Sequence, residues 1–267
     1  MSTNPYRLSQ SVWPIRYFVH LTPNLESATF DGDLTVELDV RSATNTVAFN
    51  AIELELGDVT ITDANGASHT ATPVMNEEFE TANVTLAAEL PVGTATLKVA
   101  FKGILNDKLH GFYRSTYVDQ DGVTQTIATT QFESTDARRA FPCWDEPIFK
   151  AEYNVTLTVP SHLSAYSNSP ELSNTDHGNG TKTLVFGPTM KMSTYLVAFV
   201  VGPFEESETV DVDGVPLRII FPKGKGHLSP FATEVGAFAL RWFSNYFNIP
   251  YPGDKLDMIA IPDFAFG

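Results

Sequence analysis

The charged and amide side chains best placed for chemistry in this 267-residue sequence are concentrated in residues 130–147. Seven of them fall within sixteen consecutive positions: Gln131, Glu133, Asp136, Arg138, Arg139, Asp145 and Glu146. Such a density between segments of alternating apolar and polar residues indicates either a corner held by ion pairs or part of a binding site. Because the residues from Asp136 onward carry both signs of charge and can neutralise one another, the ion-pair interpretation is favoured for them.

Gln131 and Glu133 differ from the rest of this stretch because they precede the arginine pair. They are two residues apart on a segment that we expect to be extended, so both side chains should point to the same side. A carboxylate beside an amide offers negative charge and several hydrogen-bond acceptors, which suits an ammonium group. The pair is therefore a candidate cation-recognition site.

Other catalytic patterns are missing from the sequence. The six histidines stand at positions 20, 69, 110, 162, 177 and 227, and no two of them have the four-residue spacing of a helical zinc motif. We therefore expect this chain to bind no metal and to hold no catalytic residue of its own. There is also no glycine-rich phosphate loop and no nucleophile elbow. The single cysteine, Cys143, has proline and aromatic neighbours, which is typical of a packed thiol.

Composition limits the class of protein and of partner. A hydrophobic content of 43% with 12% aromatic residues is typical of a folded globular chain. The formal net charge of −15 argues against nucleic acids and anionic membranes as partners, since both require clusters of Lys and Arg. No apolar run is long enough for a transmembrane helix, and residues 1–10 lack the apolar core of a secretion signal. We therefore expect a cytoplasmic protein.

The elements that position the candidate residues are predicted to be mostly short strands. Residues 34–40 alternate strictly between apolar and polar side chains, as in a half-buried strand, and similar runs recur between residues 15 and 221. Asp31-Gly32 predicts a turn before that strand, and residues 103–122 are expected to form a long polar and aromatic link. Many short strands without helical periodicity predict a mainly β fold built on a large antiparallel sheet or sandwich.

The character of the sequence changes near residue 205. Ser229-Pro230 predicts the start of a helix, and large apolar residues then recur over a wide arc as far as Phe247. A short apolar strand, 256–261, follows. Because a helix apolar over so wide an arc is normally buried, we expect a first domain in residues 1–205. Residues 206–267 then begin a second domain whose remainder is missing.

Residues 130–133, followed by residues 136–147, closely resemble the signature of the zinc aminopeptidases of the aminopeptidase N and puromycin-sensitive type. The resemblance extends over the whole chain. Residues 192–199 are similar to the end of that family's N-terminal domain, and residues 246–252 and 255–257 are similar to the opening of its catalytic domain. Residues 261–267 are similar to the run into the family's Gly-Ala-Met-Glu-Asn motif.

The resemblance implies a saddle-shaped N-terminal β domain, followed by the opening strand, helix and strand of a thermolysin-like α/β catalytic domain. It implies that Glu133 binds the α-amino group of the substrate and that Gln131 lines the adjacent specificity pocket. Gly267, which matches the first residue of the Gly-Ala-Met-Glu-Asn motif, is implied as a further substrate-binding residue. The partners are then peptides with a free N-terminus, and the cofactor is zinc in the complete enzyme. The sequence does not indicate an oligomeric state.

In the family, the zinc-binding His-Glu-x-x-His helix follows the Gly-Ala-Met-Glu-Asn motif, and this sequence ends at the first residue of that motif. We therefore expect the 267-residue chain alone to be inactive. Two alternatives remain. One is a non-catalytic scaffold or interaction module of the same fold, and the other is a bifunctional aminopeptidase/epoxide hydrolase. The presence of Gln131 and Glu133 favours the peptidase over the scaffold, because a scaffold has no need of an amine site.

Overall fold

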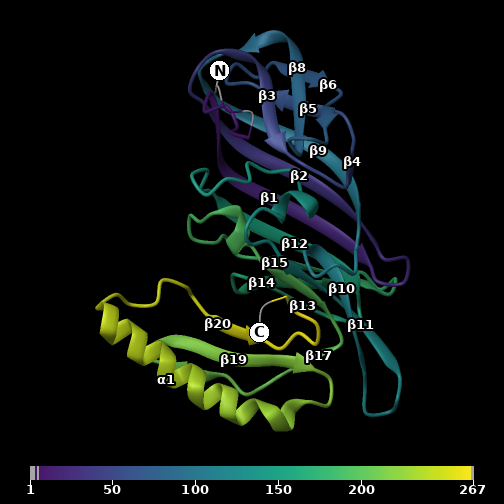
Figure 1. Cartoon of the computed structure of the whole chain (residues 1–267), viewed down its shortest axis with the longest axis vertical. Coiled ribbons are helices and arrows are strands. Elements are labelled where there is room, and N and C mark those ends of the chain that lie inside the picture. The colour runs from purple at the N-terminus through teal and green to yellow at the C-terminus, as the bar shows by residue number, and fades with distance from the viewer. Residues whose placement is uncertain (1–3, 5, 266–267) are drawn as a thin grey trace.

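Four β-sheets and one long helix make up the computed structural model, which describes residue 4 and residues 6–265. The helix, Ser229–Phe247, and the sheet next to it lie at the end of the molecule farthest from the N-terminus, and the other sheets make up the rest (Figure 1). Almost all strand pairs are antiparallel. The prediction of a mainly β fold with a large antiparallel sheet is therefore confirmed.

The largest sheet has nine strands in the order β14-β15-β12-β1-β2-β9-β5-β6, with β4 also paired to β9. Neighbouring strands within this sheet are antiparallel, except β1 and β12, which run parallel to each other. The strands are β1 (Val12–Asn24), β2 (Thr29–Val40), β4 (Leu54–Leu56), β5 (Val59–Thr62), β6 (Ser68–Ala71), β9 (Gly93–Ile104), β12 (Glu152–Pro160), β14 (Glu171–Asp176) and β15 (Thr181–Phe186).

Strand β2 has the alternation expected of residues 34–40, with its apolar side chains buried. It begins earlier than predicted, however, and the turn expected at Asp31-Gly32 is wrong. Gly32 pairs with Phe101 of β9, and a Cβ atom on Gly32 would lie 2.2 Å from the Cζ atom of Phe101. This glycine therefore makes room for a cross-strand aromatic ring and does not reverse the chain.

Gly103 has the reciprocal arrangement, since it pairs with Phe30 of β2. A Cβ atom there would lie 2.1 Å from the Cζ atom of Phe30, so Gly103→Ala should lower the free energy of unfolding by about 1–3 kcal/mol through overpacking. Gly187→Ala is the matched control, because the nearest atom to its Cβ would be 3.7 Å away. Urea denaturation of both variants tests this, and equal stabilities would contradict it.

Two smaller sheets pack beside the large one. One has the order β3-β8-β7 and the other the order β10-β11-β16-β13. The strands are β3 (Thr44–Asn50), β7 (Val74–Asn76), β8 (Thr81–Leu90), β10 (Gly111–Val118), β11 (Thr124–Gln131), β13 (Ser164–Ser167) and β16 (Phe199–Gly202). Strand β10 lies within residues 103–122, so the link predicted there is wrong. Phe112 of β10 packs on one side against Phe30 and Phe199 while the neighbouring Tyr113 is also buried, so no apolar/polar alternation marks the strand.

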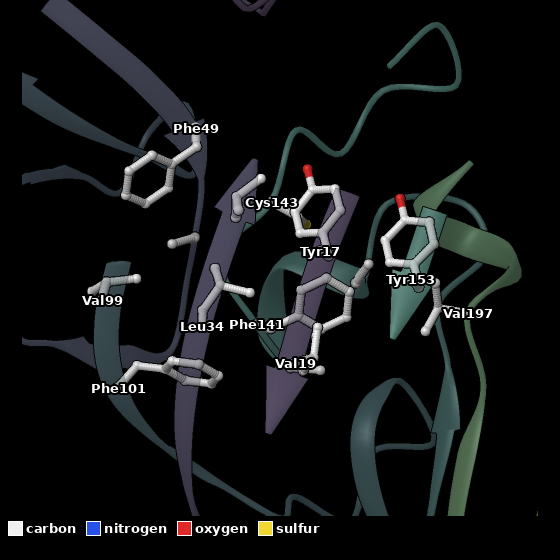
Figure 2. Packing of buried hydrophobic residues seen from close by; sticks show 14 of the residues in the cluster. Tyr17, Val19, Leu34, Phe49, Val99, Phe101, Phe141, Cys143, Tyr153 and Val197 are labelled. Carbon is white, nitrogen blue, oxygen red and sulfur yellow. The ribbon is translucent and has the colours of Figure 1, made fainter. Parts of the chain in front are cut away.

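The main core combines apolar side chains of the large sheet, of both smaller sheets and of the segment that carries residues 130–147. Tyr17 and Tyr153 stack with ring centroids 4.9 Å apart, and Phe141 packs edge-on against both rings. Figure 2 shows these rings beside Cys143 in the cluster of buried side chains. The apolar residues of this segment therefore anchor it to the core, and its charged residues are fixed in place as a result.

The C-terminal part forms the fourth sheet, in the order β17-β19-β18 with β20 paired to β19. Its elements are β17 (Phe204–Glu206), β18 (Val210–Val212), β19 (Val215–Pro222), α1 (Ser229–Phe247) and β20 (Leu256–Ile259). Short 3-10 helices lie at η1 (Ala137–Arg139), η2 (Thr194–Leu196) and η3 (Gly226–Leu228). Strands β19 and β20 are parallel and α1 connects them, so the predicted strand, helix and strand are confirmed.

Candidate functional site

Gln131 is the last residue of β11 and pairs with Gly111 of β10. Its side chain is half-buried, and the Nε2 atom donates a hydrogen bond to the backbone carbonyl of Glu133 at 3.2 Å. The amide nitrogen is therefore engaged within the chain. The side-chain carbonyl of Gln131 accepts no hydrogen bond from the described residues, which leaves it as a free acceptor.

Glu133 lies in a turn that follows β11, where the backbone N–H of Asp136 donates to the carbonyl of Phe132 at 2.9 Å. The extended segment expected through Glu133 therefore ends at Gln131. The reason is the burial of Phe132, whose ring packs on Phe141 and Phe199 and pulls the chain inward. Glu133 itself is exposed, and its carboxylate has no ion pair with residues 4 and 6–265. It is thus a free acceptor at the rim of the turn.

Gly267, the third residue implied as substrate-binding, lies outside the described residues. The chain that leads to it can be followed as far as Ala265.

The remaining charges of residues 130–147 form an ion-pair corner, as predicted. Arg138 donates to the carboxylate of Asp145 at 3.0 Å and to that of Glu80 at 2.9 Å. Arg139 contacts three carboxylates, with nitrogen–oxygen distances of 2.7–3.5 Å to Asp136, Glu53 and Glu80. Glu53 and Glu80 come from distant parts of the sequence.

Asp145 is the most buried carboxylate of this corner, and its side chain is 1% exposed. Burial raises the pKa of Asp145, while hydrogen bonds from Thr194 and Arg138 act in the opposite direction. Glu146 accepts hydrogen bonds from the Arg7 side chain at 2.8 Å and from the backbone of Leu8 at 2.6 Å, which ties down the N-terminal segment. The corner therefore has a structural role, and its carboxylates are engaged by arginine side chains or by backbone N–H groups.

Cys143 is fully buried, and burial raises the pKa of its thiol well above the ordinary value. A buried thiol with a raised pKa is a poor nucleophile. The prediction of a packed cysteine is confirmed.

Comparison with protein-family models matches residues 13–196 to the peptidase M1 N-terminal domain. The chain belongs to this M1 family. The matched range includes Gln131, Glu133 and the whole ion-pair corner, so the family resemblance stated from residues 130–147 is confirmed.

Curated M1 aminopeptidases are similar over nearly the whole chain. Aminopeptidase M1 of Arabidopsis thaliana is 43% identical over 265 residues, which is 98% of this chain and 30% of that protein. Puromycin-sensitive aminopeptidase of Caenorhabditis elegans is 38% identical over 263 residues, which is 98% of this chain and 28% of that protein. Alanine/arginine aminopeptidase of Saccharomyces cerevisiae is 38% identical over 269 residues. The chain thus spans less than a third of the length of these relatives.

The described part of this M1 chain does not fit a zinc ion. Residues 4 and 6–265 contain no group of three His, Cys, Asp or Glu side chains arranged to hold a metal. A catalytic zinc site needs three protein ligands around an open position.

In the described part of the chain, no helix is long and apolar enough to cross a membrane.

A second charge cluster joins the C-terminal part of this M1 chain to β13. Arg218 of β19 forms ion pairs with Asp257 of β20 and with Glu206. Lys255 contacts Asp257 and donates to the backbone carbonyl of Ser167 in β13 at 2.8 Å. The sequence did not suggest this cluster because its members are spread over residues 167–257.

Acidification should weaken this second cluster. Burial acts to raise the pKa of Asp257, but hydrogen bonds from Arg218 and Lys255 outweigh it and hold its pKa below the ordinary 3.8. The folded state then binds the proton less tightly than the unfolded state, so the stabilisation is present above about pH 4 and is lost as pH falls below it. The stability difference between wild type and Asp257→Asn, measured by urea denaturation, should therefore shrink from pH 6 to pH 3. A difference that is constant with pH would contradict this. Asp213→Asn, in the exposed pair with Arg241, is the control.

Proposed function

We propose that this chain is the N-terminal part of a zinc-dependent aminopeptidase that removes residues from the N-terminus of peptides. The observation that carries the proposal is the exposed, unpaired carboxylate of Glu133 next to an ion-pair corner in which the other carboxylates are engaged. The names of the M1 relatives, which are aminopeptidases, support the same activity.

Glu133 and Gln131 have separate parts in this proposal. The carboxylate of Glu133 accepts hydrogen bonds from the ammonium group at the substrate's N-terminus and balances its charge. The side-chain carbonyl of Gln131 adds an acceptor beside it and lines the first specificity pocket. The turn that carries Glu133 is anchored through buried Phe132, so the backbone at Glu133 is held in position before a substrate arrives.

The zinc ion would be supplied by the rest of the protein, because the described residues of this chain do not fit it. When bound, zinc would activate water and polarise the scissile carbonyl. The contribution of this chain is to bind the amine and so to fix where the first peptide bond lies.

We further propose that residues 1–205 form the N-terminal domain and that residues 206–267 open the catalytic domain. Helix α1 supports this division, because it buries Gly236 and Leu240 while Phe231, Phe238 and Tyr246 are 66–75% exposed. An apolar cavity of about 570 Å³ lies between the helix and residues 249–258. So large an apolar surface requires a cover, and the remainder of a catalytic domain would supply it.

The scaffold alternative and the bifunctional alternative make different predictions. A scaffold needs no free carboxylate at Glu133, so the exposure of that side chain favours the peptidase. A bifunctional aminopeptidase/epoxide hydrolase shares the amine site and would differ only in a second activity of the complete protein. The cytoplasmic location stays a prediction.

Comparison of the 267-residue chain with the complete polypeptide tests this proposal. The coding sequence after Gly267 should continue with Ala-Met-Glu-Asn and then with His-Glu-x-x-His. The complete protein should release amino acids from amino-acid 4-nitroanilides, and a zinc chelator should abolish this release. The 267-residue chain should bind no catalytic zinc and release nothing. Zinc-dependent release by the short chain, or inactivity of the complete protein, would overturn the proposal.

A further inference from the structure

The pairing of β10 with β11 places alternate residues of the two strands on one face of the sheet. Gly111, Tyr113 and Ser115 of β10 lie opposite Gln131, Thr129 and Ile127 of β11. Directly paired residues of an antiparallel sheet point to the same side. Tyr113 and Ser115 therefore share a face with the candidate amine-site residue Gln131.

Both hydroxyl groups on this face hold the chain near Asp263. The Tyr113 hydroxyl donates to the backbone carbonyl of Asp263 at 2.7 Å. The Ser115 hydroxyl donates to the Oδ2 atom of Asp263 at 3.2 Å, and it accepts a hydrogen bond from the backbone N–H of Asp263, also at 3.2 Å. Three hydrogen bonds thus fix one residue of the C-terminal segment against β10.

The two side chains that carry these hydroxyl groups are buried, although the segment that they contact is exposed. Tyr113 is 0% exposed and Ser115 is 2% exposed, whereas residues 262–265 are exposed on their other side. Burial, with the charge of Asp263 as a smaller cause, raises the pKa of Tyr113 to about 12, so its hydroxyl is a hydrogen-bond donor throughout the physiological range. The segment is therefore anchored at Asp263 by hydrogen bonds to two buried hydroxyl groups.

An apolar contact farther along the same face holds the fold independently of these hydroxyls. Ile127 packs in a cluster with Ile220, and the cluster also receives Tyr117, Ile259 and Ile261. Because this cluster keeps β20 against β11, removal of a hydroxyl group from Tyr113 or Ser115 should leave the packing intact.

We propose that Tyr113 and Ser115 are positioning residues that hold the segment around Asp263 at a fixed place relative to Gln131 and Glu133. Both residues lie on the face of the β10-β11 pair that carries Gln131, so this anchor sets where the segment around Asp263 lies beside the candidate amine site. The inference rests on the proposed function. Neither residue touches the substrate in it, and both act through the segment that they hold.

The test uses the complete protein with Tyr113→Phe and Ser115→Ala, alone and together. Each should raise KM for an alanine 4-nitroanilide about 3- to 10-fold, since Tyr113→Phe removes one hydrogen bond to Asp263 and Ser115→Ala removes two, while kcat stays within twofold. Ser115→Thr retains the hydroxyl and should restore KM. Tyr117→Phe is the matched control, because its hydroxyl lies on the same strand and face but donates to Pro203.

Hydrogen exchange provides a readout that does not depend on activity. Peptides containing Asp263 should exchange faster in Tyr113→Phe and Ser115→Ala than in wild type, while peptides from β11 should be unchanged. If KM and exchange are both unaffected although Glu133→Ala impairs the enzyme, the positioning role is wrong and the proposed function stands. If exchange rises but KM does not, the anchor exists and the link to the amine site is wrong. If wild type is inactive, the proposed function fails and the amine-site role fails with it.

Discussion

Asp145→Ala should lower the free energy of unfolding by about 3–5 kcal/mol, because it removes one partner of a buried ion pair and leaves the other charge unpaired. The side chains of Arg138 and Asp145 are 10% and 1% exposed. Asp145 also accepts hydrogen bonds from the backbone of Arg138 and from the Thr194 hydroxyl, and these donors would lose their partner too. Urea denaturation of the purified chain measures the change.

An exposed ion pair provides the matched control for this variant. Asp39 and Arg41 form a pair at 2.9 Å, with side chains 43% and 47% exposed. Asp39→Ala should change the free energy of unfolding by less than about 1 kcal/mol. If Asp145→Ala costs no more than Asp39→Ala, the ion-pair corner does not hold the fold together.

Glu133→Ala should reduce kcat/KM of the complete protein by about 10- to 100-fold, with little change in stability. The magnitude follows from the loss of a hydrogen bond to a charged group, which is worth roughly 1.5–3 kcal/mol. Stability should be kept because Glu133 is exposed and forms no ion pair with the described residues. The measurement is steady-state kinetics on a free-amine substrate, together with a melting curve for each variant.

Glu89→Ala is the control for Glu133→Ala, since Glu89 is an exposed carboxylate of β8, far from the candidate site. It should leave both the kinetics and the melting temperature unchanged. If Glu133→Ala instead unfolds the protein while the folded fraction keeps full activity, Glu133 is a structural residue and the proposed amine site is wrong.

The strands that could be predicted from the sequence are those with one buried face. Residues 34–40 alternate and form part of β2, because this strand has a core side and a solvent side. Alternation does not indicate strand β10, because Phe112 and Tyr113 are both buried on opposite faces, Phe112 in the main core and Tyr113 against the segment around Asp263. Asp31-Gly32 predicts a turn because a sequence does not reveal the Phe101 ring that occupies the space beside Gly32.

Only the features of the candidate site that come from residues close together in the sequence could be predicted. Residues 130–147 showed charges of both signs, and their mutual neutralisation followed from that alone. The contributions of Glu53 and Glu80 depend on folding, because these residues are far from the arginines in the sequence. The anchor of Asp263 on Tyr113 and Ser115 spans 148–150 residues and had no sequence signal. The turn at Glu133 depends on the burial of Phe132, which alternation did not indicate.

The central claim is that this chain carries one side of a site for a free α-amine, and substrate pairs that differ only at that amine test it most directly. The complete protein should cleave an amino-acid 4-nitroanilide with a free amine at least about tenfold faster, in kcat/KM, than its N-acetylated counterpart. The Glu133→Ala variant should reduce this ratio. Equal rates on the two substrates, or a ratio that Glu133→Ala does not change, would contradict the account.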